Sequence, residues 1–475
     1  MQERDQRRLY AFLQKYKRHF SSNGGRECKS TALQNYVPRE DLRQSHLSSS
    51  GKTFGNIVIS IVGAGVLGLP YTFKTTGWLL STMALSLVAA LCYYCMMLLV
   101  WSRKRLEKVR GCYVESFSDL GFLLYGKWGR LAVDFMLVLS QGAFCIAYLV
   151  FIGENLASVF SSRGNAASLK PHADLVQDLS DRNASNSMHI LKRLLVEVTR
   201  DDHTIAGLFS SKQDFVWISF PLEIMLASIY TLTKLAPFSI FADIVNFGSM
   251  ALVMQQDVVT MISKGVCSVS VYNSLKTLPF AIGVAIYAYE GIALVIPLES
   301  SMLEREKFGK VLGLAMVSIT ALYITFGLFG YLAFGEETLD IVTMNLEPGL
   351  KTTLVKLGLC VGLLFTFAVM MFPVHQVMEQ RLVRGKPNTL LRIVVVLMAT
   401  LCATAVPRFG DFLSLVGNSV CCALAFVVPS CFHMKAHRDD ISKSMLCIDY
   451  IIMIFGTAYG VWGTILAWSN ISPAN

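Results

Sequence analysis

The first long apolar segment of the chain, Phe54–Phe73, carries a cluster of helix-breaking residues. It contains the run Gly63-Ala64-Gly65-Val66-Leu67-Gly68-Leu69-Pro70. A helix that crosses a lipid bilayer must satisfy its own backbone hydrogen bonds, and three glycines and a proline in eight residues work against a continuous helix. Such a break persists at membrane depth only where protein buries it or where it lines a cavity. It then offers N–H and C=O groups that can bind a small polar solute.

Apolar segments near the ~20-residue length that spans a membrane recur along the whole chain. The composition agrees, because 16% of the residues are charged whereas soluble domains carry about 25%. The eleven predicted spans are Phe54–Phe73, Trp78–Trp101, Leu131–Phe160, Phe215–Leu232, Pro237–Ile262, Thr277–Leu298, Val311–Phe334, Thr352–Met378, Leu390–Val406, Phe409–Phe432 and Met445–Trp468. We therefore expect an all-α polytopic membrane protein with its termini on opposite faces.

Basic residues predict which face is cytosolic, because short cytoplasmic loops carry an excess of Lys and Arg. With the N-terminus inside, the short inner loops and their flanks hold Arg103, Lys104, Arg105, Lys108, Arg110, Lys127, Arg130, Lys234, Arg305, Lys307, Lys310, Arg381, Arg384, Lys386, Arg392, Lys435, Arg438 and Lys443. The short outer loops hold only Lys74, Lys264, Lys276, Lys351 and Arg408. We therefore expect a cytosolic N-terminus and a luminal C-terminus. The net charge of +9 then needs no nucleic-acid partner.

The chain divides into a polar tail, residues 1–51, and a transmembrane domain, residues 52–475. Apolar residues of the tail share one helical face that basic residues surround, which fits either an interfacial helix on an anionic leaflet or a solvated tail. These apolar residues are Leu9, Phe12, Leu13, Tyr16 and Phe20. Within the domain, residues 161–214 form a long predicted luminal loop with a glycosylation sequon at Asn183, and a second sequon lies at Asn470.

Several function classes lack support in the sequence. No pair of cysteines has metal-ligand spacing with histidines, and most of the twelve cysteines lie in apolar segments, where they act as small core side chains. The one glycine-rich string lies inside a membrane segment and does not follow a soluble strand, so it fails the context test for a nucleotide fingerprint. We expect neither an enzyme nor a cofactor or metal site.

The sixth predicted span repeats the signals of the first. It contains Gly283 and Gly291 on either side of Tyr289-Glu290, with Pro297 downstream. Interrupted spans at corresponding positions of two halves are typical of inverted-repeat transporters, whose binding site lies at the repeat interface. Spans one to five enter from the inside and spans six to ten from the outside, as such a repeat requires. Close helix packing is the alternative reason for the glycines.

Seven short motifs together resemble the amino acid/auxin permease family. They are Gly63–Trp78 (GAGVLGLPYTFKTTGW), Ser239–Ile244, Tyr289-Glu290-Gly291, Pro297-Leu298-Glu299, Lys307–Lys310, Gly330–Gly335 and Asp411–Gly417. The resemblance runs from about Gly51 to Trp468 and is closest to plant-type vacuolar neutral amino acid transporters, which are related to proton-coupled amino acid transporters. It implies a LeuT-type five-plus-five inverted repeat with eleven helices, of which the first and sixth are broken.

The resemblance implies a secondary carrier that moves small neutral amino acids by alternating access. We expect a proton gradient to drive it on an acidic organelle, a vacuole or lysosome, with export to the cytosol as the direction. One alternative is an amino acid sensor that signals through its cytosolic tail. Another is a carrier of a different small solute, such as an auxin-like acid or a polyamine. The expected partners are amino acids, protons and the lipid bilayer, and the sequence does not fix the oligomeric state.

An α-amino acid presents a carboxylate and an ammonium group at a fixed separation. We assign the carboxylate to the backbone at the helix 1 break, because free N–H groups and the positive end of a helix dipole favour an anion. These residues are Gly63, Ala64, Gly65, Val66 and Leu67. The ammonium is assigned to carbonyls of Ile286, Tyr287 and Ala288 at the helix 6 break. Candidates for the side-chain pocket are Gln141, Cys145, Ile146, Tyr289 and Phe367, for which ordinary core packing is the alternative.

Two carboxylates lie near the middle of predicted spans, Glu223 and Glu290. An ionised group at the bilayer centre costs about 2.5–3.5 kcal/mol or more, so such residues are candidates for function. Glu290 adjoins the helix 6 break and either carries a coupling proton or supports the unwound backbone. Asn56, in the first half of helix 1, is expected to hydrogen-bond across the bundle. Other ionisable groups lie near span ends.

Overall fold

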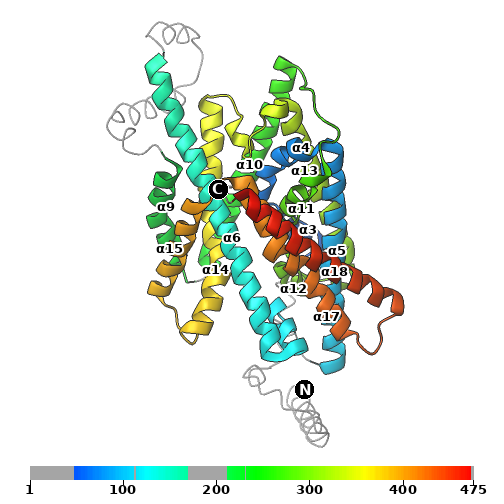
Figure 1. Cartoon of the computed structure of the whole chain (residues 1–475). Helices are drawn as coiled ribbons and strands as arrows, with labels where there is room; N and C mark the ends of the chain where they lie inside the picture. The colour runs from blue at the N-terminus through cyan, green and yellow to red at the C-terminus, as the bar shows by residue number, and fades with distance from the viewer. Residues whose placement is uncertain (1–47, 112–113, 170–210, 231, 472–475) are drawn as a thin grey trace, which may run out of the picture. The chain divides into compact units, whose positions relative to one another are not determined.

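The computed structural model describes residues 48–111, 114–169, 211–230 and 232–471 (Figure 1). The apolar tail residues between Leu9 and Phe20 and the sequon at Asn183 lie outside the described residues. The longer helices are α3 (Ser50–Ile61), α4 (Leu69–Thr76), α5 (Trp78–Arg110), α6 (Phe117–Leu169), α9 (Lys212–Ala227), α10 (Leu232–Lys264), α11 (Leu278–Ala288), α12 (Ile292–Ser301), α13 (Phe308–Phe334), α14 (Leu350–Leu382), α15 (Thr389–Ala405), α16 (Phe409–Val416), α17 (Val428–Ala436) and α18 (Lys443–Ile471).

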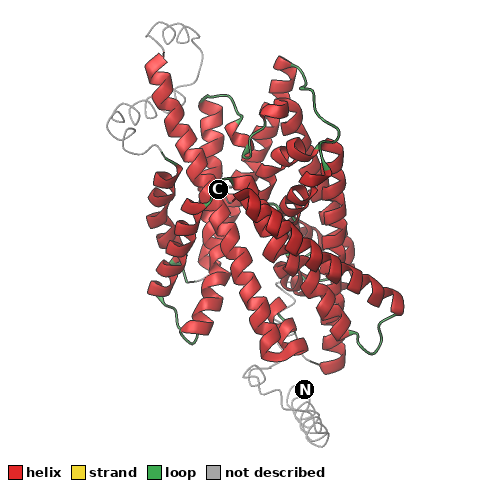
Figure 2. Cartoon of the chain, in the orientation of Figure 1, coloured by secondary structure: helices red, strands yellow, loops and turns green. Residues whose placement is uncertain are grey.

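Short 3-10 and π-helical pieces join these helices. The 3-10 pieces are η2 (Ala64–Gly68), η3 (Leu275–Thr277), η4 (Arg305–Lys307), η5 (Gly335–Glu337) and η6 (Val342–Met344). The π-helical pieces η7 (Gly417–Cys421) and η8 (Ala423–Val427) connect α16 to α17 as one continuous helical run. Figure 2 shows helix throughout the described part of the chain, where the only β-type pairing is an isolated bridge between Ser48 and Met302.

Each of the eleven predicted spans overlaps helix in the structure. Among the described residues, eight helices are long and apolar enough to cross a membrane, and a bent pair, Ser50–Ile61 with Ala64–Thr76, makes nine. The remaining two predicted spans correspond to α9, with 16 residues, and α15, with 17 residues. The fold is thus an all-helical polytopic membrane protein, as predicted.

The ends of α6 and α9 differ from the predicted boundaries. α6 begins at Phe117, 14 residues before the predicted third span, and continues to Leu169. The non-helical backbone of Gly126 (φ 68°, ψ −149°) divides it into a short first helix and a long second one. α6 also extends nine residues into the predicted loop, because no residue before Pro171 excludes a helix. α9 begins at Lys212, three residues earlier than predicted, because Ser211 and Asp214 form a capping box there.

The two broken segments lie at the centre of the helical unit. α11 packs against α4, α5, α16 and α18, and α13 packs against α3, α4 and α5. α6, α10 and α14 form a second group, in which α14 contacts both of the others, and α9 lies beside α15. In Figure 1, α9 and α15 stand together at the left, away from the labels of α3 and α11. This arrangement buries the breaks between other helices, as the bilayer argument requires.

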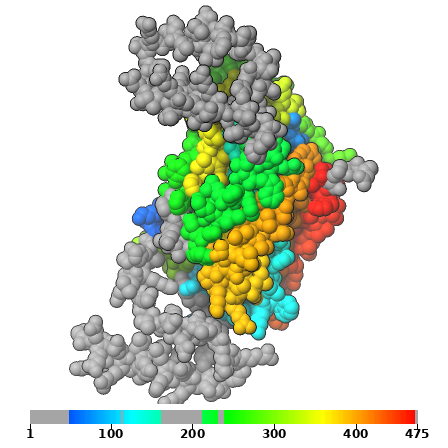
Figure 3. All heavy atoms as spheres, turned by 90° about the vertical axis from the view of Figure 1, so that its left-hand side faces the viewer, coloured from blue at the N-terminus to red at the C-terminus, as the bar shows by residue number. Residues whose placement is uncertain are grey.

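The outer helices expose apolar side chains. α9 exposes Trp217 and Met225, and α15 exposes Leu390 and Met398, all of them between 41% and 70% accessible. Figure 3 shows this side of the protein, with green and orange segments forming its surface. Exposed apolar surface of this extent is costly in water and favourable against lipid tails. The outer face is therefore that of a membrane protein.

Candidate functional site

The helix 1 break lies between α3 and η2. α3 ends at Ile61, Gly63 is extended (φ −130°, ψ −160°), and the chain re-enters helix at Ala64 after a bend of 51°. Pro70 lies in the first turn of α4, where its missing N–H costs nothing. Ala64, Gly65 and their neighbours in η2 are all buried. The predicted interruption of the first span is therefore present, and its backbone lies inside the protein.

The helix 6 break lies between α11 and α12. α11 ends at Ala288 and α12 begins at Ile292. The connecting residues are Tyr289, Glu290 and Gly291, of which Gly291 is extended (φ −178°). Pro297 lies inside α12 and does not form the break. The interruption therefore lies at the Tyr-Glu-Gly motif itself.

The two breaks touch each other at Gly65. A Cβ atom on Gly65 would lie 3.0 Å from Tyr287 Cδ1 and 3.1 Å from Ala288 Cα. A Cβ atom on Gly63 would lie 3.7 Å from the nearest atom, Tyr148 Oη, which is an ordinary contact. Only Gly65 is therefore required for close approach of the two helices. The sequence had treated both glycines alike.

The pocket candidates on α6 and α14 pack against each other and beside Tyr287. Cys145 is fully buried, and its thiol donates to the Phe367 carbonyl across 3.7 Å. One residue before it, Phe144 packs edge-on against Tyr287 with 4.6 Å between ring centroids. Gln141 and Ile146 are half-buried on the same helix. The sequence did not single out Phe144, because it looks like any other core aromatic residue.

Tyr287, in the last turn of α11, and Tyr289, just after α11, contact different helices. The hydroxyl of Tyr287 is buried and has no hydrogen-bond partner among the described residues. The hydroxyl of Tyr289 donates to Thr320 Oγ1 on α13 at 3.0 Å. Tyr287 thus packs beside the Gly65 backbone and towards α6, whereas Tyr289 contacts α13.

The three coupling candidates have different surroundings. Glu290 is half-buried, and its Oε1 atom has no partner among the described residues. Glu223 is fully buried on α9, where one oxygen accepts a hydrogen bond from Ser219 at 2.7 Å. Of the two carboxylates, only Glu290 lies at a helix break. Asn56 is exposed, so the expected hydrogen bond across the bundle is wrong: the buried side of α3 carries Thr53, Ile57 and Ile61, one turn apart.

Two residues that the sequence did not bring forward stand out in the structure. Asp257 on α10 is fully buried, and neither carboxyl oxygen has a partner within the described residues. It was visible only as an acid inside a predicted span. Tyr323 on α13 is also fully buried, and its hydroxyl donates to the carbonyls of Ile61 and Ala288. No sequence pattern distinguishes it. The second luminal sequon residue, Asn470, is exposed near the end of α18.

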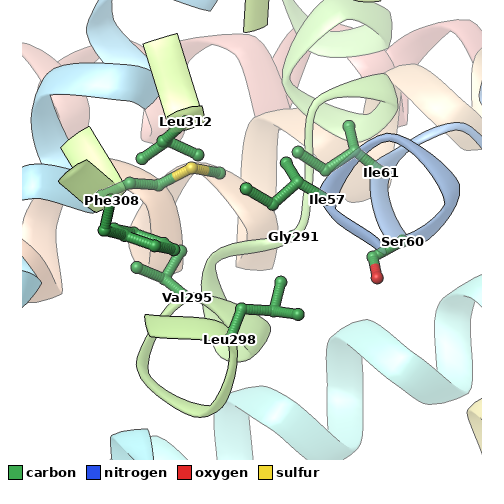
Figure 4. Close-up of a pocket in the computed structure, with 9 residues that line it drawn as sticks. Ile57, Ser60, Ile61, Gly291, Val295, Leu298, Phe308 and Leu312 are labelled. Carbon is green, nitrogen blue, oxygen red and sulfur yellow. The ribbon is translucent and has the colours of Figure 1, made fainter. Parts of the chain in front are cut away.

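A small apolar crevice lies beside the breaks (Figure 4). Ile57 and Ile61 of α3 face Gly291 and Val295 across it, and Leu312 of α13 closes another side. It has room for about one water molecule. It includes none of the residues assigned to the substrate carboxylate. The crevice therefore separates α3 from α12 and is too small to be a binding pocket for an amino acid.

Comparison with known proteins gives a family and several full-length relatives. The family described as "Transmembrane amino acid transporter protein" matches residues 46–468. Amino acid transporter AVT3C of Arabidopsis thaliana is 44% identical over 428 residues, which cover 90% of this chain and 91% of the relative. Amino acid transporter ANT1 of the same plant is 36% identical over 88% of this chain and 91% of its own length. Vacuolar amino acid transporter 3 of Saccharomyces cerevisiae is 29% identical over 94% of this chain and 60% of its own length.

Proposed function

Because the chain belongs to the transmembrane amino acid transporter family, we propose that it is a secondary carrier of small neutral amino acids in a vacuolar or lysosomal membrane. The names of its relatives support amino acid carriage and, for the yeast relatives, a vacuolar location. The observation that carries the proposal is the contact between the helix 1 break at Gly65 and the end of α11 at Tyr287 and Ala288. It brings the N–H groups at the start of η2 close to the carbonyls at the end of α11, inside the protein.

The two sets of backbone groups suit the two charges of an α-amino acid. The first turn of a helix has unpaired N–H groups and the last turn has unpaired C=O groups. η2 offers N–H groups at Ala64 and Gly65 to the carboxylate, because the Val66 N–H already donates to the Gly63 carbonyl. α11 ends in the carbonyls of Ile286, Tyr287 and Ala288. The Tyr287 carbonyl accepts from the Glu290 N–H and the Ala288 carbonyl accepts from the Tyr323 hydroxyl, and the second lone pair of each can accept from the ammonium. A backbone site of this kind recognises the part that all amino acids share. The same separation of charges recurs at broken helices in transporters.

The side chains around the contact favour a small neutral substrate. Tyr287, Phe144, Tyr148 and Cys145 are uncharged and buried. No lysine or arginine is among these side chains, so a negatively charged substrate side chain would be desolvated here without a partner, which is costly. The Tyr287 ring lies beside Gly65 and already fills much of the space. A large substrate would have to displace it.

Ion pairs at the helix ends support eleven spans. Arg105 pairs with Asp440, and Arg381 pairs with Asp134 at 2.5 Å. Each pair joins two segments at the end that the eleven-span topology places on the cytosolic side. Lys264 pairs with Glu347 at 2.7 Å between two predicted luminal loops. Arg103 with Glu299 and Arg392 with Glu379 likewise pair near the predicted cytosolic face, and Lys212 with Glu154 pairs near the predicted luminal face.

The short helices α9 and α15 also reach from one face to the other. Arg392, near the start of α15, donates to the carbonyls of Ala227 and Ile229 at the end of α9. At the other end, Lys212 of α9 donates to the carbonyl of Val406, next to the end of α15. Sixteen helical residues extend about 24 Å, and each helix thus covers most of the hydrocarbon thickness. These contacts support counting both as spans, in the N-inside orientation that the basic residues predict.

Proton coupling through Glu290 is the remaining part of the proposal. Its carboxyl lies in the connection between α11 and α12, and one oxygen has no partner among the described residues. A carboxyl that must change partners as a broken helix moves can bind a proton in one arrangement and lose it in the other. Glu223 is the second candidate, although Ser219 already occupies one of its oxygens.

Transport by the purified protein tests the proposal. The full chain is reconstituted into liposomes, and uptake of radiolabelled alanine, leucine, lysine, glutamate and indole-3-acetate is measured with and without a pH gradient. We expect gradient-dependent uptake of alanine or leucine that exceeds the uptake of the charged solutes. Uptake of only lysine, glutamate or the auxin would contradict the neutral substrate, and movement of none of them would contradict the carrier function.

A further inference from the structure

The hydroxyl of Tyr323 contacts both broken helices at the residues where their first halves end. Tyr323 of α13 donates to the carbonyl of Ala288 at 2.9 Å and to the carbonyl of Ile61 at 3.2 Å. Ile61 is the last residue of α3, and Ala288 is the last residue of α11. In the proposed orientation α3 is the cytosolic half of helix 1, and α11 is the luminal half of helix 6. The hydroxyl therefore joins parts that belong to opposite faces of the membrane.

The hydroxyl of Tyr323 can lose one of its two hydrogen bonds and keep the other. Carbonyls in the last turn of a helix lack a partner in that helix, and an unpaired carbonyl is costly in the interior of a membrane protein. A tyrosine hydroxyl has a single proton to donate. It can share that proton between both carbonyls, as the two distances allow, or give it to one of them alone. If α3 moves away, Ala288 keeps its donor and only Ile61 loses one.

The neighbours of Tyr323 hold its ring while leaving α3 freer. The Tyr323 ring packs on Tyr289 with 5.1 Å between centroids, and the Tyr289 hydroxyl donates to Thr320 one turn earlier on α13. On the α3 side lies the apolar crevice between Ile57, Ile61 and Val295 (Figure 4). The hydroxyl is thus held at α11 and α13, whereas Ile61, the α3 residue whose carbonyl it contacts, borders unfilled space.

We propose that Tyr323 is a positioning residue that holds α3 against α11 when the cytosolic path is closed and releases α3 when that path opens. The proposal rests on the alternating-access function proposed above and adds the group that biases it. Opening lets cytosolic water reach the Ile61 carbonyl, so the lost hydrogen bond is replaced. The hydroxyl then still donates to the Ala288 carbonyl, so the carbonyl at the end of α11 keeps its hydrogen bond. Removing the hydroxyl should favour the state that is open to the cytosol.

Chemical labelling of α3 measures this bias without requiring transport. Ser60, which lines the crevice on α3, is replaced by cysteine in the full chain. The exposed cysteines Cys402 and Cys447 are replaced by serine, as are Cys28 and Cys112, which lie in predicted cytosolic segments. The rate of labelling by a water-soluble maleimide from the cytosolic side reports how often α3 moves out. We expect Tyr323→Phe to raise that rate about 2- to 10-fold, which corresponds to the net effect of one hydrogen bond.

Tyr93→Phe is the matched control. The Tyr93 hydroxyl donates to the Gly309 carbonyl at 3.3 Å, so this variant also removes a tyrosine-to-carbonyl bond between α5 and α13, but at neither break. Its labelling rate should equal that of the parent. An unchanged rate in Tyr323→Phe, or an equal rise in Tyr93→Phe, would overturn the proposal.

A second variant covers the case in which Tyr323→Phe does not fold. Incorporation of 4-aminophenylalanine at position 323 supplies two N–H donors on the same ring, so both carbonyls can be satisfied at once. Labelling should then be slower than in the parent, and a rate equal to or above the parent's would contradict the proposal. Labelling does not depend on which solute is carried. A failed uptake assay would therefore refute the proposed substrate and leave this test intact.

Discussion

Replacing Gly65 by alanine probes the contact on which the proposed site rests. The added Cβ atom would lie 3.0 Å from Tyr287 Cδ1 and 3.1 Å from Ala288 Cα. Carbon atoms attract best at about 3.5–4.0 Å, so the overlap is about half an ångström. The Tyr287 ring cannot easily yield, because it is buried and packs edge-on against Phe144. The other neighbour is backbone. The two broken helices must therefore separate slightly.

The size of the effect follows from this overlap. Overpacking of a buried contact costs about 1–3 kcal/mol. If that strain falls on the arrangement in which substrate is enclosed between the breaks, Vmax/KM should fall by about 5- to 150-fold. Gly63→Ala is the matched control, because its Cβ atom would make an ordinary contact of 3.7 Å. Its backbone angle (φ −130°) also suits any residue, so we expect Vmax/KM within about twofold of the parent.

Initial rates of labelled alanine or leucine uptake into liposomes, measured over a range of concentrations, give Vmax/KM for each variant. Size-exclusion chromatography and thermal unfolding in detergent establish that the variants are folded and present in equal amounts. The reasoning fails if folded Gly65→Ala transports like the parent. It also fails if Gly63→Ala loses as much activity as Gly65→Ala, because a general effect of altering the break would then replace the specific contact.

Three further predictions concern coupling, topology and stability. Glu290→Gln should abolish pH-driven accumulation and spare exchange of internal for external substrate if Glu290 carries the proton; unchanged accumulation would assign only a structural role. Tags at the two termini should be protected from protease on opposite sides of the membrane, and Asn183 should carry a glycan in a eukaryotic host, whereas termini on one face would refute eleven spans. Arg392→Met should lower stability in a thermal unfolding assay by about 3–5 kcal/mol, because the buried Glu379 that it pairs with at 2.8 Å loses its counter-charge. Replacing Glu379 by Leu as well should recover only part of the loss, because the carbonyls of Ala227 and Ile229 still lack the Arg392 donor.

The sequence predicted the helical segments well because each depends on local composition. A run of apolar residues of the right length is visible without knowledge of its neighbours, and every predicted span overlaps a helix. The boundaries were less accurate where a cap or a turn decides them. Ser211 and Asp214 begin α9 earlier than the apolar pattern does. At Gly126 the backbone is non-helical, so a short helix from Phe117 precedes the long part of α6 that contains the predicted third span.

The breaks could also be predicted from local signals, but the roles of individual residues in them could not. Gly63 and Gly65 are equivalent in sequence, and they differ only because residues more than two hundred positions away, Tyr287 and Ala288, lie against one of them. Asn56 was predicted to bond across the bundle, yet it is exposed because it lies off the face of α3 that Ile57 and Ile61 bury. Which side of a short helix is buried depends on its packing partners.

Tyr323 illustrates a class of residue that sequence patterns cannot reveal. Its importance arises because two chain breaks leave carbonyls at Ile61 and Ala288, and because α13 places a hydroxyl between them. A glycine-rich break can be recognised from its own sequence, whereas the group that hydrogen-bonds to its backbone can come from any neighbouring helix. A broken membrane helix must find its hydrogen-bond partners in the rest of the protein, so the position of those partners links the break to the helices that move. In the proposed transport site, the residue that satisfies the backbone at the breaks is therefore also the residue that we propose governs when the site opens.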